Sequence, residues 1–339
     1  MRVLEVGMGV WGRYWARRMI PQVPEIELAG CVDRDPLALE LTMEQVGVPA
    51  ERCFTSLDEA LATTDPDAVL VATTLPSHVP VARAALEAGR HVLVEKPFAP
   101  SLAEAHALVE LAAERDRVLM VSQNYRFFPA VRGVLELVRS GELGALHEVE
   151  IDFRHSSTVS EPGARTGHRL LAQPLLMDMS IHHFDLLRLL LGRDATWVSC
   201  QAWNEPWSGF DGPPTAVAAI RFGDVVVSYR GTWFTYAPNT AWAGEWRMTL
   251  ERGEVRWTSR DLAGSEDAER VVVRTAEGVE RRLPLPVLPF VDQAGSLAEL
   301  RDAVRAGRQP ESSGRENLGS LALALAAIES AERDEPVRL

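Results

Sequence analysis

The sequence predicts an α/β fold: an N-terminal Rossmann domain built on a doubly wound parallel sheet, followed by an α+β domain with a large open, mostly antiparallel sheet. Two observations predict it. In the first third of the chain, short apolar runs alternate with helical stretches, which is typical of strands buried on both faces. In the second half, longer runs are separated by glycine turns, which is typical of antiparallel hairpins.

The composition fits two soluble domains. The chain has 339 residues, of which 46% are apolar and 24% are charged, an ordinary globular composition. A net charge of −13 disfavours nucleic acid and anionic membranes as partners. Cys31, Cys53 and Cys200 form no CxxC pair, which predicts reduced thiols. With no export signal and no spanning apolar stretch, we expect a cytoplasmic protein.

The first predicted domain, residues 1–122, alternates strands and helices. Two of its helices end at Gly47 and Gly89, because glycine readily adopts the left-handed conformation that closes a helix. The predicted strands are residues 2–6, 26–32, 68–72, 91–94 and 118–122. The predicted helices are residues 14–20, 36–46, 79–88 and 102–115.

The second predicted domain, residues 123–339, is expected to bind substrate and to form oligomers. Turns at Gly223 and Gly253 indicate antiparallel hairpins, and residues 205–214 form a predicted loop. The predicted strands are residues 146–154, 197–203, 216–222, 225–232, 246–251, 254–258 and 270–274. The predicted helices are residues 130–139, 177–191, 294–306 and 316–332, the last of which is a candidate to pack back toward the first domain.

The first motif is a glycine turn between the first strand and the first helix. Its sequence Gly7-Met8-Gly9-Val10-Trp11-Gly12 fits GxGxxG. Gly7 permits the tight turn, Gly9 lets the backbone approach a pyrophosphate, and Gly12 lets helix and strand pack closely. We therefore expect Gly7, Gly9, Val10, Trp11 and Gly12 to bind a dinucleotide; a glycine turn without a ligand is the alternative.

An acidic residue at the end of the second strand supports this reading. Asp33 lies about 20 residues beyond the turn, where a carboxylate accepts from a ribose hydroxyl. It favours NAD, because a carboxylate repels the 2′-phosphate of NADP. Arg34 could pair with that phosphate instead, or be a solvated surface residue, so NADP stays open.

A lysine follows the predicted strand 91–94. Glu95-Lys96-Pro97 stands at the carboxyl edge, where open α/β sheets bind ligands. Lys96 can present a cation to a reacting oxygen there. A surface salt bridge between Glu95 and Lys96 is the alternative.

A histidine motif opens the predicted helix 177–191. Asp178, His182 and Asp185 are spaced i, i+4 and i+7 and so share one helix face. A carboxylate beside an imidazole suits general acid/base work, whereas His183 is expected to pack structurally. The alternatives are a carboxylate at the helix dipole, a satisfied interface histidine or a metal site. We predict no metal, because no further His/Cys cluster has ligand spacing.

These motifs resemble those of the glucose–fructose oxidoreductase / inositol dehydrogenase / MocA family. The resemblance spans nearly the whole chain: the glycine turn, residues 69–78, 84–97 and 124–126, and the Asp178–His182 helix. Glu-Lys-Pro with the downstream Asp-x-x-x-His is its more specific part. It implies an NAD(P)-dependent dehydrogenase of a sugar, anhydrosugar or cyclitol that forms a homodimer or homotetramer through its open sheet.

The resemblance also implies roles for single residues. Lys96 would lie beside the nicotinamide and the substrate hydroxyl, and His182 would be the acid/base with Asp178 as its partner. Arg126 would join Lys96, Asp178 and His182 around the substrate. Further dinucleotide contacts would come from Thr73, Thr74, Pro76, His78, Glu95, Lys96 and Asn124, with Asp33 and Arg34. This chain departs from the family at Ala172-Gln173-Pro174 and at Ser180, positions where members often have glycine, which alters the expected pocket shape.

The predicted reaction is the reversible oxidation of a secondary alcohol to a ketone. The rivals are a NAD-dependent glycoside hydrolase using transient oxidation, a non-catalytic dinucleotide-sensing regulator, and a reductase of a non-sugar substrate. Trp203, Trp207 and Trp242 are candidates to stack on a sugar ring. The alternative is that the tryptophans are buried at a subunit interface of the open sheet.

Overall fold

The computed structural model describes residues 1–156, 167–260 and 268–339. It has two compact units: the first is Met1–Asn124 with Pro289–Leu318, and the second is Tyr125–Leu288 with Gly319–Leu339. The chain first crosses between units after Asn124, whereas the sequence placed the boundary after residue 122. The larger correction concerns Pro289–Leu318, which was expected in the second domain. Its helix α8 (Asp292–Ala306) packs against first-unit elements, and the Ser312 carbonyl accepts the Val121 N–H.

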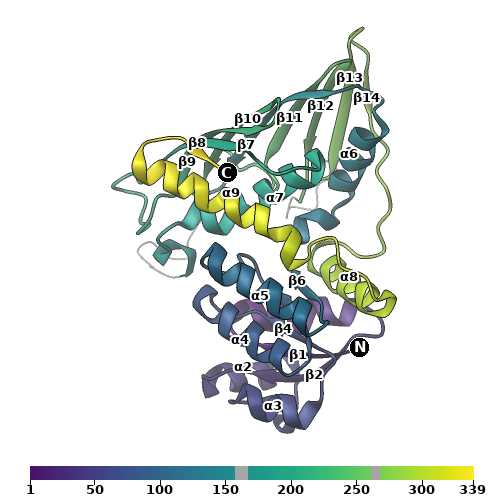
Figure 1. Ribbon diagram of the computed structural model, residues 1–339, viewed down its shortest axis with the longest axis vertical. Helices are drawn as coiled ribbons and strands as arrows, with labels where there is room; N and C mark the ends of the chain where they lie inside the picture. The colour runs from purple at the N-terminus through teal and green to yellow at the C-terminus, as the bar shows by residue number, and fades with distance from the viewer. Residues whose placement is uncertain (157–166, 261–267) are drawn as a thin grey trace. The chain divides into compact units, whose positions relative to one another are not determined.

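The first unit contains a six-stranded parallel sheet with the order β3-β2-β1-β4-β5-β6 (Figure 1). Its middle strands read AVLV and HVLV and are almost wholly buried, as expected where both faces of a sheet are covered. The strands are β1 (Arg2–Val6), β2 (Glu27–Val32), β3 (Cys53–Phe54), β4 (Ala68–Val71), β5 (His91–Val94) and β6 (Leu119–Val121). The two-residue β3 was not predicted, since it is too short to show a pattern.

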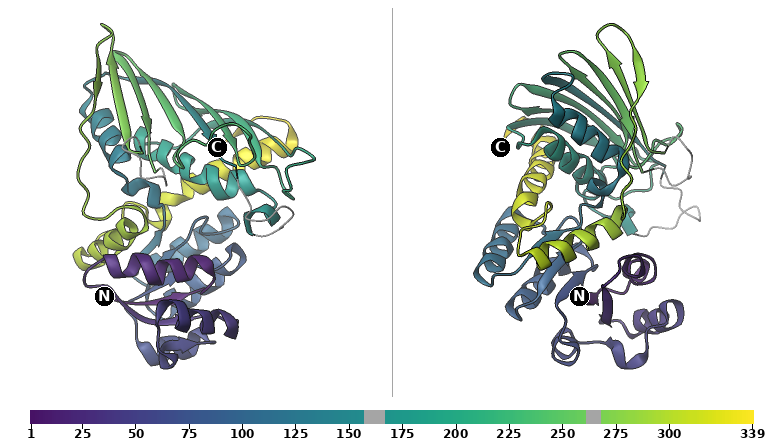
Figure 2. Two further views of the ribbon diagram at one scale, coloured as in Figure 1. Left: turned by 180° about the vertical axis from the view of Figure 1, so that it is seen from behind. Right: turned by 90° about the vertical axis from the view of Figure 1, so that its right-hand side faces the viewer.

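Helices cover both faces of this sheet. The pair α4 and α5 packs together on one face (Figure 1), and α1 lies on the other (Figure 2). The helices are α1 (Val10–Tyr14), α2 (Pro36–Val46), α3 (Leu57–Thr64), α4 (Leu75–Glu87) and α5 (Leu102–Glu114). Helix α2 begins where the Asp35 carboxylate accepts the Leu37 N–H and ends at Gly47, with φ +82°. Helix α3 was not predicted.

Two segments predicted as regular helix are π-helical. They are η1 (Trp15–Met19), which continues α1, and η6 (Pro174–Met179), which precedes α7 (Ser180–Leu191). A π-turn bonds i to i+5 and rotates the side chains that follow, and such turns are frequent at functional sites. The step from Asp178 to His182 therefore runs from a π-helix into an α-helix, and the i, i+4 face predicted for an unbroken helix does not carry over directly.

The second unit contains a nine-stranded sheet with the order β14-β13-β12-β11-β7-β10-β9-β8-β15. Every neighbouring pair is antiparallel except β7 with β10, which confirms a mostly antiparallel sheet. The strands are β7 (Leu146–Arg154), β8 (Trp197–Trp203), β9 (Thr215–Phe222), β10 (Val225–Thr232), β11 (Glu245–Leu250), β12 (Gly253–Thr258), β13 (Arg270–Thr275), β14 (Glu280–Arg282) and β15 (Val337–Arg338).

Only one face of this sheet is covered by helices. The helices α6 (Pro129–Ser140), α7 and the later part of α9 (Gly314–Arg333) lie on it (Figure 1), and among the described residues no helix covers the other face (Figure 2). The strands accordingly alternate buried and exposed residues, as in β11. Across the described residues, no helix combines the length and the apolar character needed to cross a membrane. The three cysteines are free thiols.

Candidate active site

The glycine turn has the geometry of a dinucleotide cradle. Gly7 has φ +99°, and a Cβ there would lie 2.7 Å from the Ala72 backbone; a Cβ on Gly12 would lie 1.8 Å from the Gly7 oxygen. Around Gly9, by contrast, nothing lies within 4 Å of an added Cβ. Gly9 also caps α1 without a side-chain hydrogen bond. An anion can therefore approach the N–H groups at this helix start closely, and the turn fits a pyrophosphate.

Asp33 lies directly at this turn. One of its oxygens accepts the Met8 N–H at 2.7 Å and the other accepts the Asp35 N–H at 3.0 Å. These bonds hold the carboxylate at the carboxyl end of β2, where a ribose hydroxyl is expected. Arg34 next to it is exposed.

The loop after β4 also adjoins the turn. The Thr73 methyl group would be 2.8 Å from a Cβ on Gly7, and the exposed Thr74 and Pro76 begin α4. His78 is 2% exposed, and its two ring nitrogens contact the carbonyls of Pro97 and Thr73 at 2.8 and 3.0 Å. Burial lowers its pKa. His78 therefore ties two loops together, and its contact with the dinucleotide stays a prediction.

Glu95 is buried, so the surface salt bridge considered for it is excluded. Its Oε1 accepts the indole N–H groups of Trp11 at 2.8 Å and Trp15 at 2.9 Å, and its Oε2 accepts the Lys96 backbone N–H at 3.2 Å. Burial raises the pKa of Glu95, while the Lys96 charge and these hydrogen bonds oppose the rise. The Glu95 carboxylate thus joins the glycine-turn helix to the end of β5, and its predicted contact with the dinucleotide stays a prediction. Sequence reasoning missed Trp15, for which the tryptophan spacing gave no signal.

Lys96 is half-buried at the carboxyl end of β5. It is the single lysine of the chain; the other basic residues among the 35 are arginines. Arginine is a planar, permanently charged fork, whereas lysine is a compact point charge that can exchange a proton.

The Asn124-Tyr125-Arg126 segment follows β6 and places its three residues in different surroundings. Asn124 is 4% exposed, and its amide donates to Asp292 at the start of α8. The Arg126 guanidinium donates to both oxygens of Asp185 at 2.6 and 2.7 Å, with both side chains 2% exposed. Arg126 and Asp185 thus form a buried ion pair, which the sequence did not predict; the expected substrate contact of Arg126 stays a prediction.

His182 lies on α7 within a stack of rings. It is 5% exposed, and the Tyr125 ring lies parallel to it, with centroids 4.1 Å apart and planes inclined by 5°. Asp178 is half-buried in the preceding π-helix; its pairing with His182 stays a prediction. The flat contact with Tyr125 fixes the plane of the imidazole. A general acid/base needs such a fixed plane, because its nitrogen must be directed at the proton that it transfers.

Arg260 adjoins the far side of this stack. Its guanidinium donates to the Tyr125 hydroxyl at 2.7 Å and lies 5.7 Å from the Trp242 ring centroid. Arg260 has φ +63°, a left-handed conformation that is uncommon for arginine. The half-buried Glu269 carboxylate accepts the Arg260 N–H at 2.7 Å and so holds that conformation. No sequence signal marked Arg260, because it is an arginine among many.

His183 has the structural role that was predicted, and this is confirmed. It is fully buried, and its ring nitrogens contact the Tyr229 hydroxyl at 3.2 Å and the Trp242 carbonyl at 3.1 Å. Burial lowers its pKa to about 4, so the ring is neutral at pH 7. Ser180, one of the family departures, is also buried, with its hydroxyl 2.8 Å from that of Tyr229. The serine at position 180, where family members often have glycine, therefore lies in the core of the second unit.

The three candidate sugar-stacking tryptophans have different surroundings. Trp242 stacks on His155 with centroids 3.9 Å apart and adjoins Arg260. Trp203 and Trp207 are 42% and 68% exposed. Of the three, only Trp242 belongs to the ring cluster around His182. The described residues contain no group of three or more His, Cys, Asp or Glu placed to hold a metal.

Comparison with known proteins identifies the family. A family described as "Oxidoreductase family, NAD-binding Rossmann fold" matches residues 1–123, and the GFO/IDH/MocA C-terminal domain matches residues 131–256. The chain is 30% identical over 287 residues to a 1,5-anhydro-D-fructose reductase of Ensifer adhaerens, covering 83% of this chain and 82% of that protein. It is 28% identical over 321 residues to a D-apiose dehydrogenase of Paraburkholderia graminis, covering 92% and 83%.

The fold is shared with solved structures. An oxidoreductase from Agrobacterium radiobacter, solved in complex with NAD+, L-tartaric acid and magnesium, superimposes with a TM-score of 0.84 at 22% identity, covering 100% of this chain and 98% of that one. At that identity the likeness concerns the fold. The expectation of NAD as cofactor is confirmed by the family match and agrees with the open cradle at Gly9. The chain therefore belongs to the glucose–fructose oxidoreductase / inositol dehydrogenase / MocA family of NAD-binding oxidoreductases.

Proposed function

We propose that this oxidoreductase reversibly oxidises a secondary hydroxyl of a sugar, anhydrosugar or cyclitol to a ketone. The observation that carries the proposal is the single lysine of the chain, kept at the carboxyl end of β5 within the unit that bears the dinucleotide cradle. The names of the two relatives, a reductase of an anhydrosugar and a dehydrogenase of a pentose, support this substrate class.

The residues divide the reaction between them. The bound nicotinamide would accept or supply the hydride. His182 would take the hydroxyl proton, with its ring plane set by Tyr125, and Asp178 would assist it. Lys96 would stabilise the negative charge that develops on the substrate oxygen. Trp242 and His155 would offer aromatic faces to the C–H side of a sugar ring.

A nicotinamide-absorbance screen of sugars, anhydrosugars and inositols, with NAD and NADP side by side, tests the proposal. Turnover that is lost in Lys96→Ala and not restored in Lys96→Arg supports an amine requirement. Nitrophenyl glycosides belong in the screen, because sugar release without net NADH would reveal the glycosidase reaction instead. Dinucleotide binding without turnover on any polyol would favour a sensing role and contradict the proposal.

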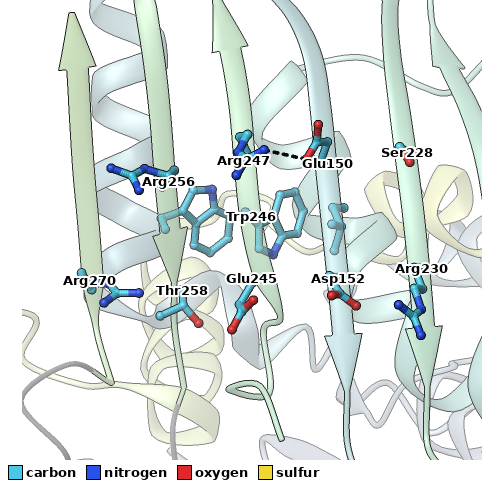
Figure 3. A pocket seen from close by; sticks show the side chains of 12 residues that line it. Glu150, Asp152, Ser228, Arg230, Glu245, Trp246, Arg247, Arg256, Thr258 and Arg270 are labelled. Atoms are coloured by element: carbon cyan, nitrogen blue, oxygen red, sulfur yellow. Dashed lines mark hydrogen bonds and ion pairs between the residues drawn. The ribbon is translucent and has the colours of Figure 1, made fainter. Parts of the chain in front are cut away.

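We also propose that copies associate through the helix-free face of the second sheet. This face is strongly charged (Figure 3), with a hollow of about 420 Å³ bordered by acidic and arginine side chains. Arg247 pairs with Glu150 at 3.4 Å, and Arg256 pairs with Glu280 at 2.6 Å. Rows of opposite charge can meet the same rows of a second copy. Trp246 and Trp257 also line this hollow (Figure 3), but both are already only 2% exposed within the unit, so an interface there would bury little more of them.

Light scattering tests the association. Reversing Arg247 and Arg256 to glutamate should convert an oligomer to monomer, and an unchanged mass would contradict this interface. A cytoplasmic location remains our proposal, supported by the three free thiols.

A further inference from the structure

One carboxylate joins the dinucleotide cradle to the candidate catalytic lysine. Oxygen Oε1 of Glu95 accepts two indole N–H groups, from Trp11 and Trp15, and Oε2 accepts the backbone N–H of Lys96. Glu95 is 7% exposed and Trp15 is fully buried. A buried carboxylate is costly unless donors satisfy it, and here three N–H groups do so from two separate elements.

The two indoles come from the element that follows the glycine turn. Trp11 is the fifth residue of the GxGxxG motif and lies in the first turn of α1. Trp15 begins the π-helical segment η1. A π-turn changes the direction of the side chains on a helix, and in this helix both indoles, four positions apart, reach the same oxygen. The other seven tryptophans of the chain lie beyond residue 190, so these are the two in the nucleotide half.

We propose that Trp11 and Trp15 are positioning residues, which act through Glu95 to set the place of Lys96 relative to the dinucleotide cradle. The inference rests on the role proposed above for Lys96. Because Lys96 is the next residue and its backbone N–H is bonded to the same carboxylate, a displacement of the glycine-turn helix is transmitted to the lysine. Occupation of the cradle and placement of the amine are thereby coupled.

Glu95 is the centre of this arrangement, and its conservative variant separates the two sides. Glu95→Gln keeps an oxygen for the indoles but places an NH2 group against the Lys96 N–H. It therefore removes the hydrogen bond to Lys96 and keeps those to the two tryptophans. Trp11→Phe and Trp15→Phe remove the donors and break the helix side alone. Trp11 is 42% exposed, so Trp11→Phe leaves the core intact even if Trp15→Phe does not fold.

The single lysine makes a direct measurement available. Protein labelled with ¹³C at the lysine ε-carbon gives one lysine signal by NMR, and it reports on Lys96 without dinucleotide or substrate. We expect Glu95→Gln and Trp11→Phe each to move this signal. Because a misplacement of about 1 Å can cost roughly 10²-fold in rate, we expect kcat at saturating NAD to fall at least about tenfold in both variants.

Trp257→Phe is the matched control, because it removes a buried indole from the second unit; it should leave the lysine signal in place. The inference is overturned if folded Trp11→Phe and Glu95→Gln both give the wild-type lysine signal and a kcat within about twofold of wild type. The proposed function fails separately: if Lys96→Ala keeps full turnover, the lysine has no catalytic role, whatever its signal shows in the tryptophan variants.

Discussion

The two units surround their candidate functional residues in different ways. In the first, Lys96 follows a carboxylate that is held by hydrogen bonds from a neighbouring helix. In the second, His182 lies flat against Tyr125, and Arg260 bonds to the far side of that ring. The difference follows from the chemistry: a point charge needs only a fixed position, which hydrogen bonds supply, whereas an imidazole needs a fixed plane, which a stacked ring supplies.

On this comparison His182 has the stricter geometric requirement, because its ring plane must be fixed as well as its position. Replacing His182 therefore has the largest expected effect. His182→Ala should lower kcat by about 10²–10⁴-fold, the usual contribution of a general acid/base. NAD affinity should stay close to wild type, since the cradle belongs to the other unit. Stopped-flow turnover and fluorescence titration with NAD measure the two effects. Turnover near the wild-type level would remove His182 from the mechanism.

The two units also differ in the ionisable group that each buries, a histidine in the second unit and a glutamate in the first. The histidine is His183. Its pKa is lowered to about 4, so between pH 6.5 and 4 the unfolded chain binds a proton that the folded protein does not. Stability is therefore lost as the pH falls through this window, by at most roughly 3 kcal/mol for this group. In His183→Gln the free energy of unfolding, measured by urea titration at several pH values, should fall less steeply on acidification.

The exposed His147 supplies a matched control for that measurement. His147→Gln should leave the slope unchanged, because it removes an exposed imidazole and leaves the buried His183 ring in place. Equal slopes in wild type and in His183→Gln would show that the buried ring does not govern the acid response.

In the first unit, Glu5 on β1 predicts the opposite response. It is fully buried, burial raises its pKa well above the usual range, and neither of its carboxyl oxygens has a hydrogen-bond partner within the described parts of the chain. The folded protein therefore keeps a proton that the unfolded chain loses, and stability is lost as pH rises above the ordinary carboxyl range. Glu5→Leu should raise the free energy of unfolding at pH 7 by about 1–3 kcal/mol, with a larger gain at pH 8 than at pH 5.

Glu5→Gln separates charge from polarity at the same site. The amide cannot ionise but is still polar, so it should abolish the pH dependence of this position without the full stabilisation given by leucine. If Glu5→Leu destabilises the protein at every pH, the carboxyl group has partners that outweigh its burial.

The two units also differ in how much of each could be predicted from the sequence. The first unit was largely predictable, because its buried parallel strands appear as apolar runs and its glycine turn, Asp33 and Lys96 stand at strand ends. His182 and Lys96 could be proposed as site residues because family motifs mark them. The cluster around His182 could not be found, since Tyr125, Trp242 and Arg260 are brought together by sheet register and by a left-handed arginine that no local pattern announces.

Likewise, a π-helical turn hid a change of helix face. A regular helix was assumed from residue 177, so the change of face after Asp178 could not be read from spacing. The approach of Trp15 to Glu95 was missed because spacing along a helix does not say which strand end its side chains meet. The burial of Arg126 against Asp185 was missed because the charge pattern does not distinguish a substrate contact from a structural ion pair.

The smallest expected effect tests whether stacking alone orients the imidazole. Tyr125→Phe keeps the ring on His182 but loses the hydroxyl bonded to Arg260, whereas Tyr125→Leu loses the flat face as well. If the plane of the ring matters more than the hydrogen bond, Phe should retain kcat within about threefold and Leu should lower it about tenfold, with little change in KM, because proton transfer rather than binding is affected. Equal losses in Phe and Leu would mean that the hydroxyl and Arg260 carry the effect. The histidine side would then depend on a hydrogen bond, as the lysine side does, and the distinction between the two units would not hold.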